Sequence, residues 1–289
     1  MPELPEVQTV VDGLLPHVVG RTVHRVRSGP HDIVHPRGML LDPRLVGRTI
    51  SRINRRGKKI VFTLDDHARF VVHLGMTGQL TLDAPDAPVL SHTHLVLSFT
   101  DATPTQLRFR DPRRFGGVWW LGQTEAPDEQ MGPEPLTMRW VTLARHLGPT
   151  RRAIKTALLD QKVVAGIGNI YADESLFEAR IDPRTPACQL TPEQVRRLCR
   201  AIKLILRRAI RHRGSTLRDY RDADGLEGGF QKLHRVYDRA TLPCRRCKTP
   251  INRIVLGGRS THYCTGCQVA LNFPVTGASV DPNKDQCRH

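Results

Sequence analysis

The sequence contains no run of about 18 apolar residues, which argues against a transmembrane helix. Its first residues are acidic and include prolines, so they also lack the basic and apolar regions of a secretory signal. We find no internal repeat and no long low-complexity segment. These absences favour a globular chain over a membrane-spanning, secreted or repeat protein.

Acidic residues are scarce relative to basic ones, with 28 Asp and Glu against 44 Lys and Arg and a formal net charge of +16. Such an excess favours a polyanionic partner, because lysine and arginine bind phosphates and release counterions. A basic surface that is merely solvated is the alternative, and membrane attachment fits less well. With 289 residues, 39% of them hydrophobic, the chain can form about two domains and a small module.

Cysteine is also rare, with 7 in the chain, but four of the cysteines form two C-x2-C pairs separated by 16 residues: Cys244, Cys247, Cys264 and Cys267. This spacing is typical of a four-thiolate zinc site, and the alternative is four ordinary buried or paired cysteines. Two short strands around a glycine turn are expected between the pairs. So small a module needs the metal for stability, and thiols that bind metal must stay reduced. We therefore expect one structural Zn²⁺ and an intracellular, cytoplasmic location.

The first half of the chain predicts an antiparallel β-sandwich or barrel after an opening helix at about 6–15. Short β-branched or aromatic segments alternate there with Gly, Pro and Asp turns, as in antiparallel sheets. The predicted strands are 22–27, 50–54, 59–64, 70–74, 94–99, 107–110 and 118–121.

Beyond a Met-Gly-Pro-Glu-Pro segment at 131–135, which is typical of a linker, the apolar period becomes helical. Thr191 and Gln194 form a predicted capping box with Pro192 in the first helical turn. Apolar residues then recur at helical spacing until Gly214 stops the pattern. The middle third of the chain is therefore expected to be helical.

A glycine turn at 165–169 lies between two expected helices, 153–161 and 170–179. Such a turn exposes backbone N–H groups at a helix N-terminus, where a phosphate can bind, and Asn169 can add a side-chain amide. A plain helix–turn–helix connection explains the same residues about as well. The basic composition favours the phosphate interpretation.

The N-terminus offers a candidate nucleophile. Pro2 becomes a secondary amine if Met1 is removed, and Glu3 and Glu6 follow closely. An α-amino group has a pKa of roughly 7.7–8.0, so part of it is unprotonated near neutral pH. The alternative is that these residues simply open the chain.

Two further segments combine charge with side chains that can fill a gap in a base stack. Met76 lies in a glycine-rich turn, and Phe115 lies beside Arg110, Arg113 and Arg114. A protein that extracts a base from duplex DNA needs such fillers. The alternative is that Met76 and Phe115 are core residues and that the nearby His73 is structural.

These motifs together resemble the formamidopyrimidine-DNA glycosylase family, which removes oxidised purines. The resemblance covers roughly 1–268, and its motifs stand in order at 2–6, 73–80, 111–116, 166–174 and 244–267. It implies an α+β multidomain fold: an N-terminal antiparallel β-sandwich with flanking helices, a helical helix–two-turn–helix domain and a C-terminal zinc-ribbon β-hairpin. The corresponding ranges are a catalytic domain at 1–135, a linker at 136–150, a DNA-binding domain at 151–232, a zinc finger at 233–268 and a flexible tail at 269–289.

The resemblance also implies the chemistry. The enzyme would excise 8-oxoguanine and formamidopyrimidines and cleave the abasic site by β,δ-elimination through a Schiff base on Pro2. Glu3 would act as general acid and base, Glu6 would position or tune the amine, and Lys58 would lie beside the lesion phosphate. The positions that match phosphate-contacting residues are His73, Asn169, Tyr237 and Arg259. The positions that match void-filling residues are Met76, Arg113 and Phe115, and 214–231 corresponds to the loop that covers the extruded base.

Damaged double-stranded DNA is the partner that the resemblance implies, with a monomeric enzyme and no nucleotide cofactor. Two alternatives stay open. A related glycosylase and lyase would act on oxidised pyrimidines or on abasic sites only. A non-catalytic zinc-ribbon DNA-binding protein would need neither a free Pro2 nor Glu3.

Overall fold

The computed structural model describes the whole chain except residues 30–32, 101–104, 125–129, 218–219 and 269–289. The tail that we expected to be flexible, 269–289, lies outside the described residues. The chain divides into two compact units. The first holds the described residues of Met1–Glu129 and Arg208–Lys232, and the second holds those of Gln130–Arg207 and Leu233–His289.

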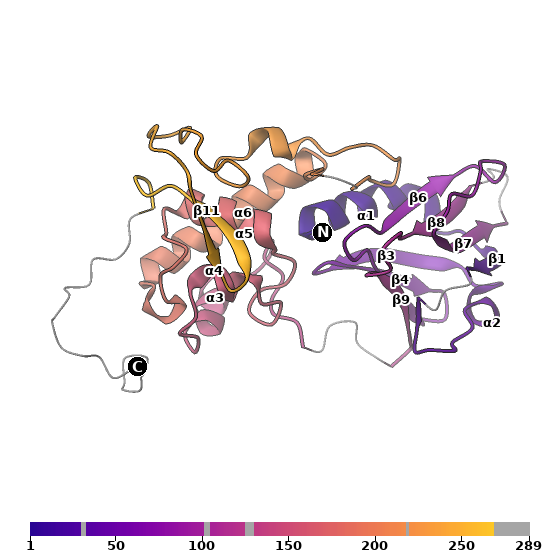
Figure 1. Cartoon of the computed structure of the whole chain (residues 1–289). Coiled ribbons are helices and arrows are strands. Elements are labelled where there is room, and N and C mark those ends of the chain that lie inside the picture. Colours follow the sequence, from indigo (N-terminus) through magenta and orange to yellow (C-terminus); the bar gives the residue numbers. More distant parts are fainter. Residues whose placement is uncertain (30–32, 101–104, 125–129, 218–219, 269–289) are drawn as a thin grey trace. The chain divides into compact units, whose positions relative to one another are not determined.

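Two sheets form the first unit (Figure 1). One has the strand order β1-β7-β8-β6, with β1 (Val23–Ser28), β6 (Gln79–Asp83), β7 (Thr93–Phe99) and β8 (Gln106–Arg110). The other has the order β2-β9-β5-β4-β3, with β2 (Val34–His35), β3 (Ile50–Arg56), β4 (Lys59–Leu64), β5 (Arg69–His73) and β9 (Gly117–Gly122). All of these pairings are antiparallel except the short parallel pairing of β2 with β9.

The core of this unit draws apolar side chains from both sheets and from helix α1 (Leu4–Val18). The rings of Phe62 on β4 and Phe70 on β5 stack with their centroids 4.5 Å apart, and both side chains are fully buried. Helix α1 packs on β3, β4 and β6, and its buried Val7, Val10 and Leu14 recur at helical spacing. Because α1 packs directly on this core, the residues at its N-terminus have a fixed position within the unit.

The predicted strands are all present, with ends shifted by one or two residues. Two strands were missed. The two-residue β2 is too short to show a pattern, and the half-polar β6 pairs only with β8 at the sheet edge. The short helix α2 (Asp42–Leu45) was also missed. Helix α1 begins at Leu4 rather than near 6, because Pro5 is tolerated in a first turn and Glu3 and Glu6 form a capping box.

The second unit is mainly helical and ends in a two-stranded hairpin. Its helices are α3 (Trp140–Leu147), α4 (Ile154–Leu159), α5 (Asn169–Ala179) and α6 (Pro192–Arg211), whose last turn groups with the first unit. Short 3-10 turns occupy Ala187–Gln189 and Phe230–Leu233. The hairpin pairs β10 (Asn252–Leu256) with β11 (Arg259–Tyr263), as expected between the cysteine pairs. The α+β multidomain fold class is thereby confirmed.

Two of the expected domain ranges differ from the structure. The segment 136–150, expected to be a linker, contains α3, whose Leu143 and Leu147 are buried in the second unit. Residues 208–232, expected with the helical domain, group with the first unit because Ser215 and Ala223 bond to its helix α1 and strand β6. No helix among the described residues is long and apolar enough to cross a membrane.

We expect Phe70→Ala to destabilise the first unit by about 3–5 kcal/mol, since it removes a fully buried ring and leaves a cavity against Phe62. Urea unfolding followed by tryptophan fluorescence measures this, because Trp119 and Trp120 lie in β9. Phe115→Ala is the control, since that ring is 54% exposed, and its unfolding midpoint should change little. Equal destabilisation by the two substitutions would contradict the described core.

Candidate functional site

The N-terminal carboxylates are buried and held by backbone hydrogen bonds. Glu3 and Glu6 are 3% and 2% exposed, and Pro2 is buried beside them. One oxygen of Glu6, Oε2, accepts the Glu3 N–H at 2.8 Å, and Oε1 accepts the Ser215 N–H at 2.7 Å. Gly214 has φ +76, and a Cβ there would lie 2.6 Å from Glu6 Oε1, so only glycine fits. The Glu6 carboxylate therefore has a single fixed position next to the candidate nucleophile.

A second contact comes from Tyr220, which the sequence analysis did not single out. Its hydroxyl donates to the Glu6 backbone carbonyl at 3.2 Å, and the side chain is only 7% exposed. Burial, and then the negative charge of Glu6, raises the pKa of Tyr220 well above its usual range, so the hydroxyl stays protonated. Two points of the 214–220 segment thus bond to Glu6.

Lys58 and His73 lie where β4 meets its neighbours in the five-stranded sheet. Lys58 is 8% exposed in the turn before β4, and Lys59 pairs in register with His73. Burial, and then the charges of Lys59 and Lys58, lower the pKa of His73. The imidazole is therefore neutral at neutral pH and can donate one N–H. Arg55 joins this turn to α1 by donating to the Gly57 carbonyl and to Gln8.

Met76 and Phe115 are exposed, by 41% and 54%, so the interpretation of them as core residues is wrong. The Arg113 guanidinium lies over the Phe115 ring, 4.5 Å from its centroid. Both apolar side chains stand on loops at the surface. The three side chains remain available for a partner.

These two loops are locked together beneath the exposed side chains. Asp111, fully buried, accepts hydrogen bonds from the Thr77 hydroxyl at 2.5 Å and the Gly116 N–H at 2.8 Å. A Cβ on Gly75 would lie 2.3 Å from the Gly116 nitrogen, so the two backbones touch. Met76 and Phe115 are consequently carried by one rigid surface rather than by two independent loops.

In the second unit, Asn169 contacts the hairpin strand that carries Arg259. Asn169 begins α5 directly after the Gly168 N-cap, and its amide donates to the Ser260 hydroxyl at 3.3 Å. Ser260 follows Arg259, which is exposed at the start of β11. The other amide atom, Asn169 Oδ1, is buried without a hydrogen-bond partner among the described residues. Asn169 at the start of α5 thus bonds to the residue next to Arg259 on the hairpin.

A buried ion pair fixes the hairpin to this helix. The Lys155 Nζ lies 2.7 Å from Asp173 Oδ1 and donates to the Ser260 carbonyl at 2.6 Å, with both charged side chains fully buried. Asp173 Oδ2 accepts the His262 N–H at 2.9 Å. Removing one member would leave an uncompensated buried charge, which makes the arrangement difficult to disrupt locally.

The adjacent Glu174 performs the same task for Tyr237. Its carboxylate accepts the backbone N–H groups of Arg235, Val236 and Tyr237 at 2.9–3.0 Å. Burial raises the pKa of Glu174, and the three N–H donors oppose that shift. The Tyr237 ring meets the His262 ring edge-on, with centroids 5.2 Å apart. Two consecutive acidic residues of α5 therefore hold two separate segments of the second unit.

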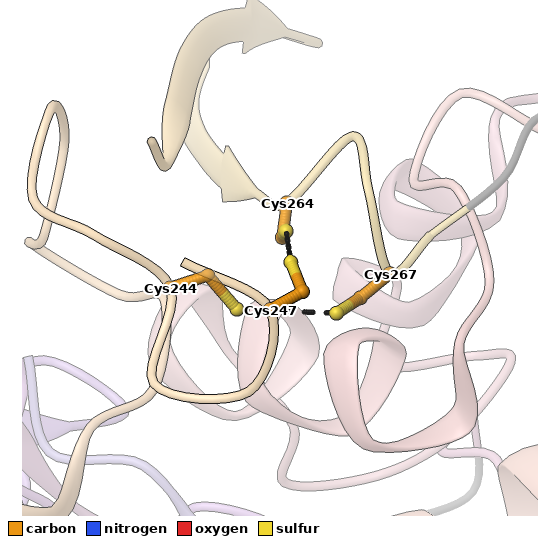
Figure 2. Close-up of side chains that lie close together, drawn as sticks. All are labelled: Cys244, Cys247, Cys264 and Cys267. Atoms are coloured by element: carbon orange, nitrogen blue, oxygen red, sulfur yellow. Dashed lines mark hydrogen bonds between the residues drawn. The ribbon is translucent and has the colours of Figure 1, made fainter. Parts of the chain in front are cut away.

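The four cysteines of the C-x2-C pairs converge on one point (Figure 2). All four Sγ atoms lie within 4.8 Å of one another, with 3.9 Å between Cys244 and Cys267 and 3.3 Å between Cys247 and Cys264. Tetrahedral zinc at about 2.3 Å from each sulfur requires sulfurs about 3.8 Å apart, which this cluster matches. None of the four forms a disulfide, and hydrogen bonds from Thr249 lower the pKa of Cys247 to about 6. The donor set fits one structural zinc ion, as predicted.

The structure groups the predicted site residues by unit. The first unit holds Pro2, Glu3, Glu6, Lys58, His73, Met76, Arg113 and Phe115, and the second holds Asn169, Tyr237, Arg259 and the four cysteines. The sequence analysis missed the residues that hold them in place: Asp111, Lys155, Asp173, Glu174, Ser215 and Tyr220. Asp111, Asp173 and Glu174 stand inside quoted motifs, but nothing in the sequence indicated their distant partners.

Comparison with known proteins matches three regions of the chain to family models. Residues 1–118 match the family model of the formamidopyrimidine-DNA glycosylase N-terminal domain, 131–221 match the H2TH domain of that glycosylase, and 242–269 match the zinc finger found in FPG and IleRS. A formamidopyrimidine-DNA glycosylase of Cupriavidus pinatubonensis is 46% identical over 283 residues, covering 93% of this chain and 100% of the relative.

Solved structures agree in fold. The MutM (Fpg) protein of Thermus thermophilus has a TM-score of 0.81 and 41% identity, covering 92% of this chain and 98% of that one. The Lactococcus lactis Fpg in complex with DNA containing an abasic site has a TM-score of 0.85 and 35% identity, covering 93% and 100%. Other complexes of the Lactococcus protein contain Fapy-dG DNA or oxidised-pyrimidine DNA.

We expect removal of zinc by a chelator to unfold the hairpin β10–β11 before the helices of the second unit. The hairpin depends on the four thiolates, whereas α4 to α6 have their own buried apolar side chains. Hydrogen exchange measured with and without the chelator reports both regions. Cys199→Ser, measured without the chelator, is the control, because Cys199 lies on α6 and is not one of the four clustered cysteines. The hairpin β10–β11 of this variant should stay protected from exchange. Unchanged protection of the hairpin after complete metal removal would contradict the structural role of zinc.

Proposed function

Because the chain belongs to the formamidopyrimidine-DNA glycosylase family, we propose that it excises oxidised purines from double-stranded DNA and then cleaves the abasic site by β,δ-elimination. The observation that supports this most directly is the fixed Glu6 carboxylate, bonded to the Glu3 and Ser215 N–H groups beside Pro2. A buried carboxylate with two backbone donors keeps one position. An amine nucleophile must be held in the right orientation toward the reacting carbon, and the fixed backbone beside Pro2 provides this.

In the proposed reaction, Pro2 is the nucleophile once Met1 has been removed. Its nitrogen lone pair forms a bond to C1′ of the damaged nucleoside, and the bond from C1′ to the base breaks with its electron pair leaving on the base. The nitrogen loses its proton, and the bond from C1′ to O4′ breaks as O4′ takes up a proton, which opens the sugar ring and leaves an iminium at C1′. This iminium withdraws electrons from the sugar and acidifies the C2′ proton. Loss of that proton breaks the bond from C3′ to its phosphate, and a second elimination releases the 5′ phosphate.

Glu3 acts as the general acid and base of these steps, and Glu6 positions the amine. Glu3 is the residue next to the nucleophile and is 3% exposed, so its carboxyl group moves protons in a site from which most water is excluded. The role of Glu6 follows from its bonds, since its carboxylate fixes the Glu3 N–H and with it the first turn of α1. Both residues act at the sugar rather than on the base.

Phosphate contacts come from two sets of residues. Lys58 and His73 act in the first unit, where the lowered pKa of His73 makes it a neutral N–H donor rather than a cation. Asn169, Tyr237 and Arg259 act in the second unit, where α5 supplies backbone N–H groups and the helix dipole. Contacts of this kind position the duplex without reading its sequence.

Met76, Arg113 and Phe115 fill the space that the extruded base leaves in the stack. Their exposure, and the rigid loop pair beneath them, support this role, because a flexible wedge would lose entropy on insertion. The bound zinc supplies stability to the hairpin that carries Arg259. A closed four-thiolate site has no open coordination position with which to activate water.

Borohydride trapping on three duplexes tests the proposal: one with 8-oxoguanine opposite cytosine, one with an oxidised pyrimidine and one with an abasic site. We expect a covalent adduct on the 8-oxoguanine and abasic duplexes, and none when Pro2 is blocked. Glu3→Gln should abolish base removal while DNA binding stays within a few-fold.

The other outcomes separate the alternatives. An adduct on the abasic duplex alone would support the proposed lyase activity and contradict the proposed removal of oxidised purines. An adduct formed preferentially on the oxidised-pyrimidine duplex would favour the related glycosylase. Absence of any adduct would leave a DNA-binding protein without this chemistry. Full glycosylase activity of Glu3→Gln would contradict the assignment of Glu3.

Arg259→Ala should weaken DNA binding and reduce the slope of log K against log salt by about 0.9, the contribution of one phosphate contact. Titrations by fluorescence anisotropy at several salt concentrations give this slope. Arg253→Ala is the matched control, since Arg253 is exposed on the other strand of the same hairpin. We expect the Arg253 variant to keep most of the slope. An equal loss in both variants would indicate a general charge effect instead of a specific contact.

A further inference from the structure

Two residues after the end of helix α6, Arg213 adopts a backbone conformation that is usual for glycine. Arg213 has φ +61, and its N–H bonds to the Ile210 carbonyl at 2.9 Å. The Gly214 N–H bonds to the Ala209 carbonyl at 2.9 Å, so the helix closes with a Schellman motif. The residue in the left-handed position is usually glycine because a Cβ there is sterically unfavourable.

The Arg213 side chain clamps two carboxylates. Its Nε donates to Asp222 Oδ2 at 2.6 Å, and its Nη2 donates to Asp224 Oδ2 at 2.9 Å. Asp222 is 1% exposed on its side chain, whereas Arg213 is 44% exposed. A buried carboxylate needs a fixed partner, so Asp222 is the group that depends on the clamp. This clamp, Arg213 with Asp222 and Asp224, joins the residue that precedes Gly214 to the residues that follow Tyr220.

Asp222 in turn organises a tight turn that is docked on the first unit. Its Oδ1 accepts the N–H groups of Asp224 at 3.1 Å and Leu226 at 2.9 Å. The carbonyl of Ala223, within this turn, accepts the Leu82 N–H of β6 at 3.1 Å. The clamp therefore fixes the turn, and the turn attaches the segment to the sheet.

The same segment supplies two hydrogen bonds to Glu6, one to its side chain and one to its backbone carbonyl. The donor Ser215 stands two residues after Arg213, and the donor Tyr220 stands two residues before Asp222. The two ends that the clamp joins thus lie next to the two points that hold Glu6. Releasing the clamp would loosen the backbone at both points.

We propose that Arg213 is a positioning residue for the N-terminal nucleophile, acting through the clamp with Asp222 on the segment that holds Glu6. The proposal rests on the proposed function for its catalytic consequence. No contact of Arg213 with DNA is required, since its charge is used within the protein. Loss of the clamp therefore affects the rate of the chemical step and leaves DNA affinity in place.

Arg213→Gly tests this cleanly, because glycine keeps the backbone conformation and removes only the side chain. We expect the single-turnover rate of Schiff-base trapping on an abasic duplex to fall about tenfold, with the Kd for DNA unchanged within about twofold. Hydrogen exchange at the Asp224 and Leu226 amides should accelerate in the same variant. Arg213→Lys, which keeps the charge but not the paired donors, should recover part of the rate.

Arg180→Gly is the matched control. Arg180 also has positive φ, at +55, at the end of α5, is exposed and makes no ion pair with a described residue. We expect its trapping rate and exchange to equal those of the wild type. Combining Arg213→Gly with Asp222→Asn should cost no more rate than Arg213→Gly alone, because the neutral amide no longer needs the guanidinium.

Unchanged trapping in Arg213→Gly, or a loss that appears equally in the Kd, would overturn the proposal. Additive losses in the double variant would do the same. A wild-type protein that is trapped on no duplex would overturn the proposed function and the catalytic half of this proposal together. Exchange at the Asp224 and Leu226 amides would then still decide whether the clamp orders the turn.

Discussion

The carboxylate of Glu6 is the point on which the first unit depends. It joins the start of α1 to residues more than 200 positions later in the chain, through the Glu3 and Ser215 N–H groups. A buried carboxylate has a large desolvation cost unless every oxygen is bonded, so the two donors and the acid stabilise one another's positions. The tight approach of Gly214 to Oε1 leaves no room for an alternative arrangement. The hydrogen bonds of Glu6 therefore fix the backbone next to Pro2, the candidate nucleophile.

In the second unit, buried carboxylates on α5 also accept backbone hydrogen bonds from distant segments. Asp173 bonds to the hairpin and Glu174 bonds to the 235–237 backbone, so one helix fixes the segments that carry Arg259 and Tyr237. Acidic side chains are thus used inside the protein. Those buried among the described residues are Glu3, Glu6, Asp111, Asp173, Glu174, Asp182 and Asp222. Because so many of the few acids are internal, the outer surface is more basic than the net charge of +16 alone indicates.

Sequence patterns predicted most elements because strand alternation, helical period and cysteine spacing are local properties. They missed α3 and β6, whose short patterns are weak, and they grouped 208–232 with the helical domain rather than with the sheets. They also missed Ser215 and Asp173, since nothing near a carboxylate in sequence specifies a backbone donor 89 or 209 residues away. They missed the Arg213 clamp as well, because Arg and Asp nine residues apart form no recognisable motif. The candidate side chains were readable from motifs, whereas the contacts that position them required the fold.

The hydrogen bonds that hold the loops at Met76 and Phe115 do not use the side chains of these two residues. Asp111 bonds the loops that carry Met76 and Phe115 through Thr77 and Gly116, and both apolar side chains stay exposed. Had these loops been held by packing of their own side chains, the same groups would be buried and unable to enter a base stack. The exposure of Met76 and Phe115 on fixed loops therefore follows from the buried position of Asp111. Burying several carboxylates carries an unfavourable desolvation free energy. Their hydrogen bonds in return order the site before any partner binds.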